Sequence, residues 1–498
     1  MQTTVQQRVE IHDRFQVEMK VEYFLQASEQ TRYRITTYFF FPYSLGINEA
    51  TFPAEEFYRR IQNYIRLKTP EFALEELLSG ATSPLLLIEA LMADAQWQAR
   101  QSIQQRLKNQ FRFLRPILHR CLSRQMQRTA RVVQQGLSDP DMVVTSLSHT
   151  LATINAILAR IRRCGAQIEA CAVDTPLAES YRLTDEALSL VVEDNLFKLL
   201  ARLTAEEQPF VVGLRQQLMA SIQQEIDYRR RRGYPSILQP GVNDEHYLYR
   251  ISALKKYTSS VLYLATTVGR EGATVEQLLF AVAAGISMVF ATVVAFYFQA
   301  LYGNFTFPVF IALVVGYMFK DRIKELGRSL SVSFLRRRYY DRRIDVDTLD
   351  QEQRVGHVRE KVVFLDEREL PSQIRELRQR SVIAKIGNEG QEERILCYTR
   401  DVTLRTGTFQ RIYPDGPPIT GVSDIMRLDV RPFLHKMDEP YERRPYLDST
   451  GLRKVKCPKV YYVNAITICT GAHAGDQIIA QRVVLTLNRK GVTHVEAR

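Results

Sequence analysis

The chain has 498 residues, enough for roughly two or three domains with ordinary hydrophobic cores. Its 67 lysines and arginines outnumber 55 aspartates and glutamates, and the net charge of +12 indicates an anionic partner, either nucleic acid or the anionic face of a membrane. Six cysteines are too few for a disulfide framework in a chain of this length, and none forms the C-x-x-C pair typical of structural zinc sites.

Residues 1–54 are expected to form an N-terminal β segment. Apolar residues alternate with polar ones between Phe15 and Tyr23, and a second run, 33–41, is rich in β-forming residues. Because an isolated two-stranded hairpin is only marginally stable in water, these strands need a partner. We expect them to pack with the β segments near the C-terminus, which would bring the two ends of the chain together.

Residues 55–232 are predicted to be a bundle of α-helices. The clearest stripe follows Pro140, where apolar residues recur at spacings of three and four at Leu147, Leu151, Ile154, Leu158 and Ile161. Several such stripes in succession must be buried against one another, which favours a bundle, with an extended coiled-coil stalk as the alternative. Residues 233–245 hold two glycines and two prolines and are predicted to be a linker.

A transmembrane hairpin is predicted within residues 246–345, which we expect to be juxtamembrane helices around two spans. Residues 278–319 contain 42 residues without a formal charge, which is too many for one span but enough for two helices joined by a tight turn. The spans are placed at about 278–298 and 305–325, and the second reaches adequate length only if Lys320 and Arg322 extend toward the membrane surface. The alternative is a soluble, buried helical hairpin.

The charges around this hairpin predict its orientation. Basic residues follow the second span, whereas the turn between the spans is uncharged, so the positive-inside rule places both termini in the cytoplasm, at the inner membrane. An anionic inner leaflet is therefore the expected partner, and nucleic acid is not. The residues predicted to contact anionic lipid are Lys320, Arg322, Lys324, Arg336, Arg337 and Arg338.

Small residues repeat at every fourth position in both spans. Such strips let helix backbones approach closely, which is how packing energy is gained in lipid. The strip either seals the two spans of one chain together or mediates formation of a homo-oligomer. Its members are Ala283, Ser287, Ala291 and Ala295 in the first span and Ala312 and Gly316 in the second.

Beyond the membrane segment, residues 346–381 are rich in charge and are predicted to be a helical connector. Residues 382–498 are predicted to be a small antiparallel β domain, either a sandwich or a barrel. Its expected strands lie at 394–399, 402–404, 408–413, 424–430, 460–470 and 478–487. The predicted fold class is thus an integral membrane α+β protein with a two-helix transmembrane hairpin, a cytoplasmic α-helical bundle and a small antiparallel β domain.

No motif in the sequence supports catalysis, a metal site or a cofactor. Ser252 and Lys255 have the Ser-x-x-Lys spacing of some acyl-transfer enzymes but lack its companion motifs, and no phosphate loop or dinucleotide fingerprint occurs. The leading hypothesis is therefore a membrane-anchored cytoplasmic interaction or regulatory protein, scaffold-like, with an unidentified protein partner. A membrane-tethered enzyme of unrecognised type remains a further alternative.

The turn between the spans supports one other hypothesis. Tyr302, Gly303, Asn304 and Phe305 lie between two spans near a long helical region, and this corner resembles that of CorA-type magnesium channels. Those channels carry Gly-Met-Asn there and end soon after the second span, whereas this chain lacks the methionine and continues for about 175 residues. The resemblance implies an oligomeric ion channel or transporter, because two spans of one chain cannot enclose a pore.

Overall fold

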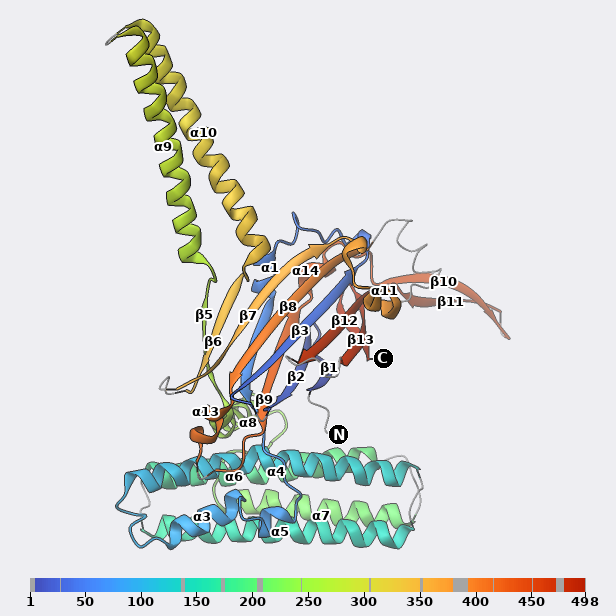
Figure 1. Cartoon of the computed structure of the whole chain (residues 1–498). Coiled ribbons are helices and arrows are strands. Elements are labelled where there is room, and N and C mark those ends of the chain that lie inside the picture. Colours follow the sequence, from blue (N-terminus) through green and yellow to red (C-terminus); the bar gives the residue numbers. More distant parts are fainter. Residues whose placement is uncertain are drawn as a thin grey trace. The chain divides into compact units, whose positions relative to one another are not determined.

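The computed structural model describes residues 5–26, 28–135, 139–171, 175–203, 209–242, 244–303, 306–349, 353–378, 393–414, 416–449, 451–471 and 479–497. The chain is a mixed α+β protein with antiparallel sheets and forms two compact units (Figure 1). The β unit comprises Met1–Tyr64, Ala265–Thr406 and Asp424–Arg498, and the helical unit comprises Ile65–Leu264 and Gly407–Ser423.

The largest sheet of the β unit has eight antiparallel strands in the order β14-β13-β12-β3-β8-β7-β6-β5. Their bounds are β3 (Gln30–Phe41), β5 (Ala265–Gly269), β6 (Arg342–Asp347), β7 (Arg354–Leu365), β8 (Arg394–Arg405), β12 (Tyr461–Gly471), β13 (Ile479–Asn488) and β14 (Gly491–Ala497). The N-terminal strand β3 pairs with β8 on one side and β12 on the other. This confirms the prediction that N-terminal and C-terminal strands pack together.

A second sheet has the order β1-β2-β9-β4, and a separate ribbon is formed by β10 and β11. The bounds are β1 (Val5–Asp13), β2 (Gln16–Phe24), β4 (Ile61–Leu67), β9 (Gly421–Asp429), β10 (Tyr441–Asp448) and β11 (Gly451–Pro458). Strands β2 and β3 follow each other in sequence but belong to different sheets. The main core contains side chains from both sheets, such as Met19 and Leu428 from one and Phe39 and Leu396 from the other.

Short helices complete the β unit. They are α1 (Ala54–Arg60), α11 (Ser372–Arg378), α14 (Arg431–Leu434) and the 3-10 turns η1 (Tyr43–Leu45) and η3 (Glu367–Glu369). On the other face of the large sheet, Ile374 of α11 packs with Tyr38, Phe40 and Ile466 in a smaller core. One part of that face is therefore covered by α11.

Two expectations for this region are wrong. The charged stretch predicted as a helical connector at 346–381 holds strand β7, in which buried and half-buried positions alternate from Val358 to Val363. Glu360 occupies one of the buried positions, so the alternation of apolar residues that signals a strand is interrupted. The strand expected at 408–413 is the helix α13 (Thr406–Ile412).

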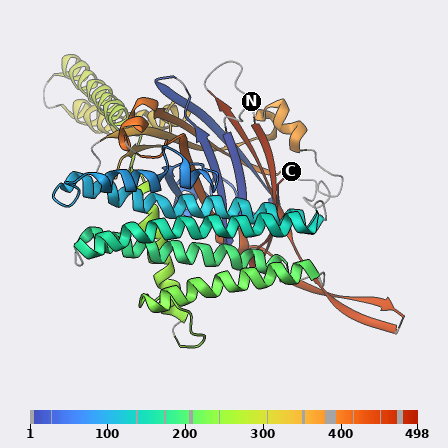
Figure 2. The same ribbon diagram turned by 90° about the horizontal axis from the view of Figure 1, so that it is seen from below.

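The helical unit contains long antiparallel helices that lie side by side (Figure 2). The bounds are α2 (Glu76–Ser79), α3 (Pro84–Ala93), α4 (Gln101–Gln135), α5 (Pro140–Cys171), α6 (Pro176–Arg202), α7 (Pro209–Arg231), α8 (Asp244–Ser259) and the 3-10 turn η2 (Ser260–Leu262). Helix α6 is buried on most of its circumference, and its buried residues include polar ones such as Asp185 and Glu193. The linker expected at 233–245 lies between α7 and α8, inside this unit, and residues 55–64 of the expected bundle belong to the β unit.

The predicted hairpin corresponds to two long helices in the β unit, α9 (Ala273–Tyr302) and α10 (Phe307–Arg338). Asn304 and Phe305, in the expected turn, lie outside the described residues. By length and composition, α9 is apolar enough to cross a membrane, as are the segments Glu76–Ala93 and Pro140–Cys171. The window in α9 is the most apolar of the three and the least buried, at 11%.

Candidate functional site

The predicted strip of small residues lies between the two helices of the hairpin. Ala283 and Ser287 of α9 and Ala312 of α10 are buried, whereas Ala291 and Ala295 are half-buried. A Cβ added at Gly327 would lie 2.7 Å from the Cβ of Ala283, which shows how closely the helices approach. The structure therefore brings the small residues together within one chain.

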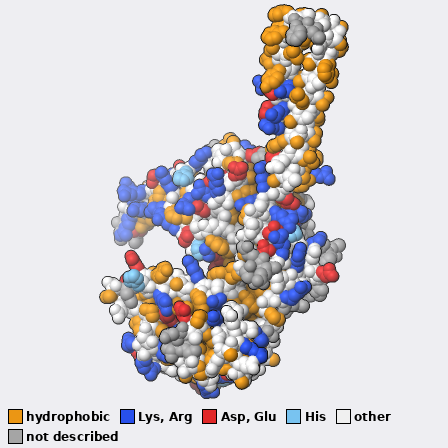
Figure 3. Space-filling model, turned by 90° about the vertical axis from the view of Figure 1, so that its left-hand side faces the viewer, with side chains coloured by type: hydrophobic (Ala, Val, Ile, Leu, Met, Phe, Trp, Pro, Cys, Tyr) orange, Lys and Arg blue, Asp and Glu red, His pale blue; other side chains and the backbone are white. Residues whose placement is uncertain are grey.

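The outer surface of α9 and of the first part of α10 is apolar and exposed. The space-filling view shows hydrophobic side chains along much of both helices, with Lys, Arg, Asp and Glu side chains gathered part-way along the hairpin (Figure 3). Leu278, Val289 and Phe296 of α9 are 64%, 63% and 67% exposed, and Phe307 of α10 is 75% exposed. A contiguous apolar surface of this extent marks a site of membrane or protein association.

The register of the two helices is a feature that composition does not predict. Added Cβ atoms at Gly316 and Gly327 would meet Val294 and Ala283, so residues of the two helices whose numbers sum to about 610 lie at one level. Lys320 therefore lies level with about residue 290, in the middle of the apolar part of α9. The charged half of α10 therefore runs beside residues 272–290, which carry a single formal charge, at Glu276.

The predicted lipid-contacting residues do not gather at one level of α10. Lys320 and Lys324 are half-buried, and Arg322 and Arg338 are exposed. Arg336 and Arg337 lie in the last turn, and their side chains are outside the described residues. At 1.5 Å per residue, Lys320 and Arg338 are about 27 Å apart along the helix axis. The structure thus places these residues along much of the helix rather than in a single belt.

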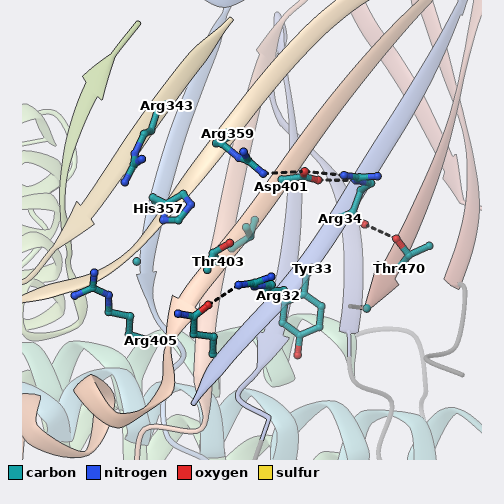
Figure 4. Close-up of a pocket in the computed structure, with 14 residues that line it drawn as sticks. Arg32, Tyr33, Arg34, Arg343, His357, Arg359, Asp401, Thr403, Arg405 and Thr470 are labelled. Carbon is teal, nitrogen blue, oxygen red and sulfur yellow. Dashed lines mark hydrogen bonds and ion pairs between the residues drawn. The ribbon is translucent and has the colours of Figure 1, made fainter. Parts of the chain in front are cut away.

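A second candidate site, which the sequence did not reveal, lies on the large sheet. The strand register aligns Thr470, Arg34, Asp401, Arg359 and Arg343 in one row across β12, β3, β8, β7 and β6. Because residues opposite one another in adjacent strands point to the same side of a sheet, these side chains share one face. Figure 4 shows the row and the ion pairs within it.

A parallel row lies two residues further along the strands. Arg32 of β3 and His357 of β7 both stand opposite Thr403 of β8, and Arg405 follows beside Gln30 (Figure 4). Together the rows line an open concavity of about 640 Å³, within which the side chains include five arginines and one aspartate. This basic concavity occupies the part of the face that lies beyond α11.

Asp401 is the carboxylate of this site, and both of its oxygens accept hydrogen bonds. Arg34 donates to its two carboxylate oxygens at 2.7 and 2.8 Å, Tyr340 donates to it, and Arg359 lies 3.7 Å away. Burial raises the pKa of Asp401, but the hydrogen bonds from Arg34 and Tyr340 outweigh it, so the pKa is lowered and the group is ionised at neutral pH.

Two cations of the concavity lack an acidic partner. Among the described residues, the side chain of Arg405 forms no hydrogen bond or ion pair, and that of Arg32 hydrogen-bonds only to the side chain of Gln30, at 2.8 Å. Burial lowers the pKa of His357, as do the nearby charges of Arg343 and Arg359, so its imidazole is neutral at pH 7. The site therefore presents positive charge that the protein itself does not neutralise.

A β-bulge shapes the edge of this site. The pairing of β6 with β7 shifts register between Val346 and Asp347, opposite Gly356. Gly356 is required because a Cβ there would lie 2.2 Å from the carbonyl oxygen of Thr403. Bulges are common where a sheet must redirect side chains at a functional site.

Within the described part of the chain, no group of three or more His, Cys, Asp or Glu side chains is arranged to hold a metal ion. The sequence signal for the basic concavity is modest: Arg32 and Arg34 alternate with apolar residues, which places both on one face of a strand. Neither a known protein family, a curated protein nor a solved structure matches this chain.

Proposed function

We propose that this protein is a membrane-anchored interaction or regulatory protein, held at the inner leaflet by the α9–α10 hairpin. The observation that carries the proposal is the exposed apolar surface of α9, where Leu278, Val289 and Phe296 are each more than half exposed. Exposure of apolar surface to water is unfavourable by about 25 cal/mol per Å². In a bilayer the same side chains contact lipid tails, so this cost does not arise. Sealing of the hairpin by small residues leaves the outer faces for lipid.

Extraction of the full-length protein from membranes tests the anchor. We expect it to stay in the membrane pellet after an alkaline carbonate wash, and the variant Val289→Lys/Val293→Lys to move to the supernatant. Each charge near the centre of a span opposes insertion by roughly 2.5–3.5 kcal/mol. The matched control is Leu248→Lys/Tyr249→Lys, which adds the same charge at two exposed residues of α8, outside the hairpin. Release of the wild-type protein by carbonate would disprove the anchor.

Topology is a separate part of the proposal. Basic residues flank the hairpin and the turn between its helices carries no charge, which by the positive-inside rule supports a cytoplasmic location for both termini. Reporters fused at residue 1 and residue 498 should both give a cytoplasmic signal. A signal from the opposite side at either terminus would contradict this orientation.

The helix register favours a second candidate function, an oligomeric channel or transporter. If α9 spans the bilayer, Lys320, Asp321 and Arg322 lie level with its apolar middle, and charged residues at that depth usually face a bundle interior or water. Several copies could shield these residues around a polar interior. A stable ring in mild detergent together with ion flux in liposomes would favour this function, and a monomer without flux would exclude it.

A further inference from the structure

We propose that the basic concavity of the large sheet binds a small ligand that carries at least two phosphate groups. The proposal rests on the β unit alone and is independent of whether the hairpin enters a membrane. It assigns a ligand class to Arg32, Arg34, Arg343, Arg359 and Arg405, which the sheet register brings to one face from three distant segments.

The charge balance of the concavity points to an anion. Its single lining carboxylate, Asp401, is already bound by Arg34 and lies near Arg359, and Arg343 is paired with Asp345 at 2.9 Å. Arg32 and Arg405 have no acidic partner among the described residues. Like charges held on one sheet face repel one another, and a bound polyanion would relieve that repulsion.

The spacing of the arginines points to more than one anionic group. Arg32 on β3 and Arg343 on β6 are separated by three strand spacings, or about 14 Å. A single phosphate cannot reach across that distance, whereas two or more linked phosphates or separate phosphate groups can. Guanidinium groups bind phosphate oxygens in a bidentate manner, which favours arginine over lysine at such a site.

The size and chemistry of the lining favour a small molecule over a nucleic-acid strand. A volume of about 640 Å³ lies within the range of small-molecule sites. Tyr33 is the aromatic residue of the lining, and it is only 3% exposed and stacks on Tyr23, so it offers no ring face to a base. Thr403, Thr470 and the neutral His357 supply uncharged groups for hydrogen bonds.

Ligand binding by the full-length protein, purified in mild detergent, tests the proposal. The probes are inorganic pyrophosphate, ATP and water-soluble dihexanoyl phosphatidylinositol 4-phosphate, each of which carries at least two phosphate groups and is titrated by calorimetry. The variant is Arg32→Gln/Arg405→Gln, because neither residue holds a structural ion pair. The matched control is Arg368→Gln/Arg375→Gln, which removes the same charge from exposed residues at η3 and α11 in the same unit.

We expect pyrophosphate and ATP to bind wild-type protein and the control alike, and the Arg32→Gln/Arg405→Gln variant to bind at least tenfold more weakly. Equal affinity for the two probes would show that the phosphates are the recognised part. Tighter binding of phosphatidylinositol 4-phosphate with the same sensitivity to the variant would identify a lipid headgroup as the source of the phosphates. Absence of binding by every probe, or equal binding by variant and control, would overturn the proposal.

Discussion

Strand β8 presents arginine in two opposite environments on its two faces. Arg400 points into the core, where its side chain is 4% exposed and forms ion pairs with Asp424 at 2.8 Å and Glu360 at 3.2 Å. Arg405, five residues later, lies on the other face and has no partner among the described residues. One arginine of the strand thus belongs to a buried network of opposite charges, whereas the other is a surface charge without an acidic partner among the described residues.

The difference separates structural arginines from candidate binding arginines. Around Arg400, Tyr398 donates to Glu360 at 2.6 Å and Asn63 donates to the same carboxylate at 2.9 Å, so the buried charges are paired and one carboxylate oxygen of Glu360 accepts two hydrogen bonds. Burial raises the pKa of Asp424, and the adjacent Arg400 opposes that rise. A network of this kind is strongly destabilised by removal of one member, whereas the open face tolerates removal. The predictions that follow each compare a residue in closed surroundings with one in open surroundings.

The largest expected effect is on the buried network. Arg400→Met leaves Asp424 buried without its cation and leaves Glu360 with the more distant Arg342, at 3.5 Å, so we expect a loss of about 3–5 kcal/mol in the stability of the β unit. Arg405→Met, on the opposite face of the same strand, should change stability by no more than about 0.5 kcal/mol. Chemical denaturation of the full-length protein, followed by hydrogen exchange in β7 and β8, measures both. Similar losses for the two variants would remove the distinction between the faces.

The helical unit offers a comparison of histidines. His119 lies on α4, where its Nδ1 is 3.2 Å from the amide nitrogen of Asn195. Burial lowers its pKa to about 4, with smaller contributions from Arg115 and Lys198. The unfolded chain therefore binds a proton that the folded chain excludes as pH falls from about 6.5 to 4.

Stability of this unit should accordingly decrease over that pH window, by at most about 3 kcal/mol from His119. We expect His119→Gln to show a smaller decrease between pH 7 and pH 4, measured as the shift in unfolding temperature by calorimetry. His246→Gln, at an exposed position on α8, is the control and should keep the wild-type dependence. Identical pH profiles for wild type and His119→Gln would exclude this role.

Two helical glycines form the next pair. A Cβ added at Gly165 of α5 would lie 1.8 Å from Cζ of Tyr181 on α6, whereas nothing lies within 4 Å of a Cβ at Gly213 of α7. We expect Gly165→Ala to destabilise the helical unit by about 1–3 kcal/mol through overpacking. Gly213→Ala should stabilise it by about 0.5–1 kcal/mol, because alanine favours the helix. If thermal unfolding showed that both variants were destabilised, or that both were stabilised, the packing argument would be wrong.

Local periodicity predicted much of this fold, because it reports which face of an element is buried. The strands β12 and β13, the helix stripe of α5 and the pair of apolar helices were all evident from spacing. The strand β7 was not, because its core positions include Glu360, whose partner Arg400 lies 40 residues away in sequence. A buried charge looks like a surface residue until its partner is known.

The candidate sites were predictable to different degrees for a related reason. Small residues at every fourth position identified the helix contact, because close packing has a local signature. The basic concavity depends on pairing of β3, β8, β7 and β6, in which residue 34 meets residue 401. Such register is set by long-range pairing and has no signature within any one segment. The level of Lys320 relative to α9 likewise depends on how two helices are aligned.

The smallest expected effect concerns that helix contact. Ala283 is 8% exposed and faces Gly327, whereas its neighbour Val282 is 51% exposed on the outer surface of α9. Ala283→Leu forces the helices apart and removes van der Waals contacts between them, so we expect a loss of about 1–2 kcal/mol in stability. Val282→Leu should have little effect, since it only extends an exposed apolar side chain. Thermal unfolding and oligomeric state, both measured in mild detergent, separate the possibilities. Because the strip seals one hairpin, Ala283→Leu should lower thermal stability while the oligomeric state persists. Loss of oligomers without loss of stability would show instead that the contact also forms between chains. Equal tolerance of leucine at positions 282 and 283 would show that the helices do not pack through this strip.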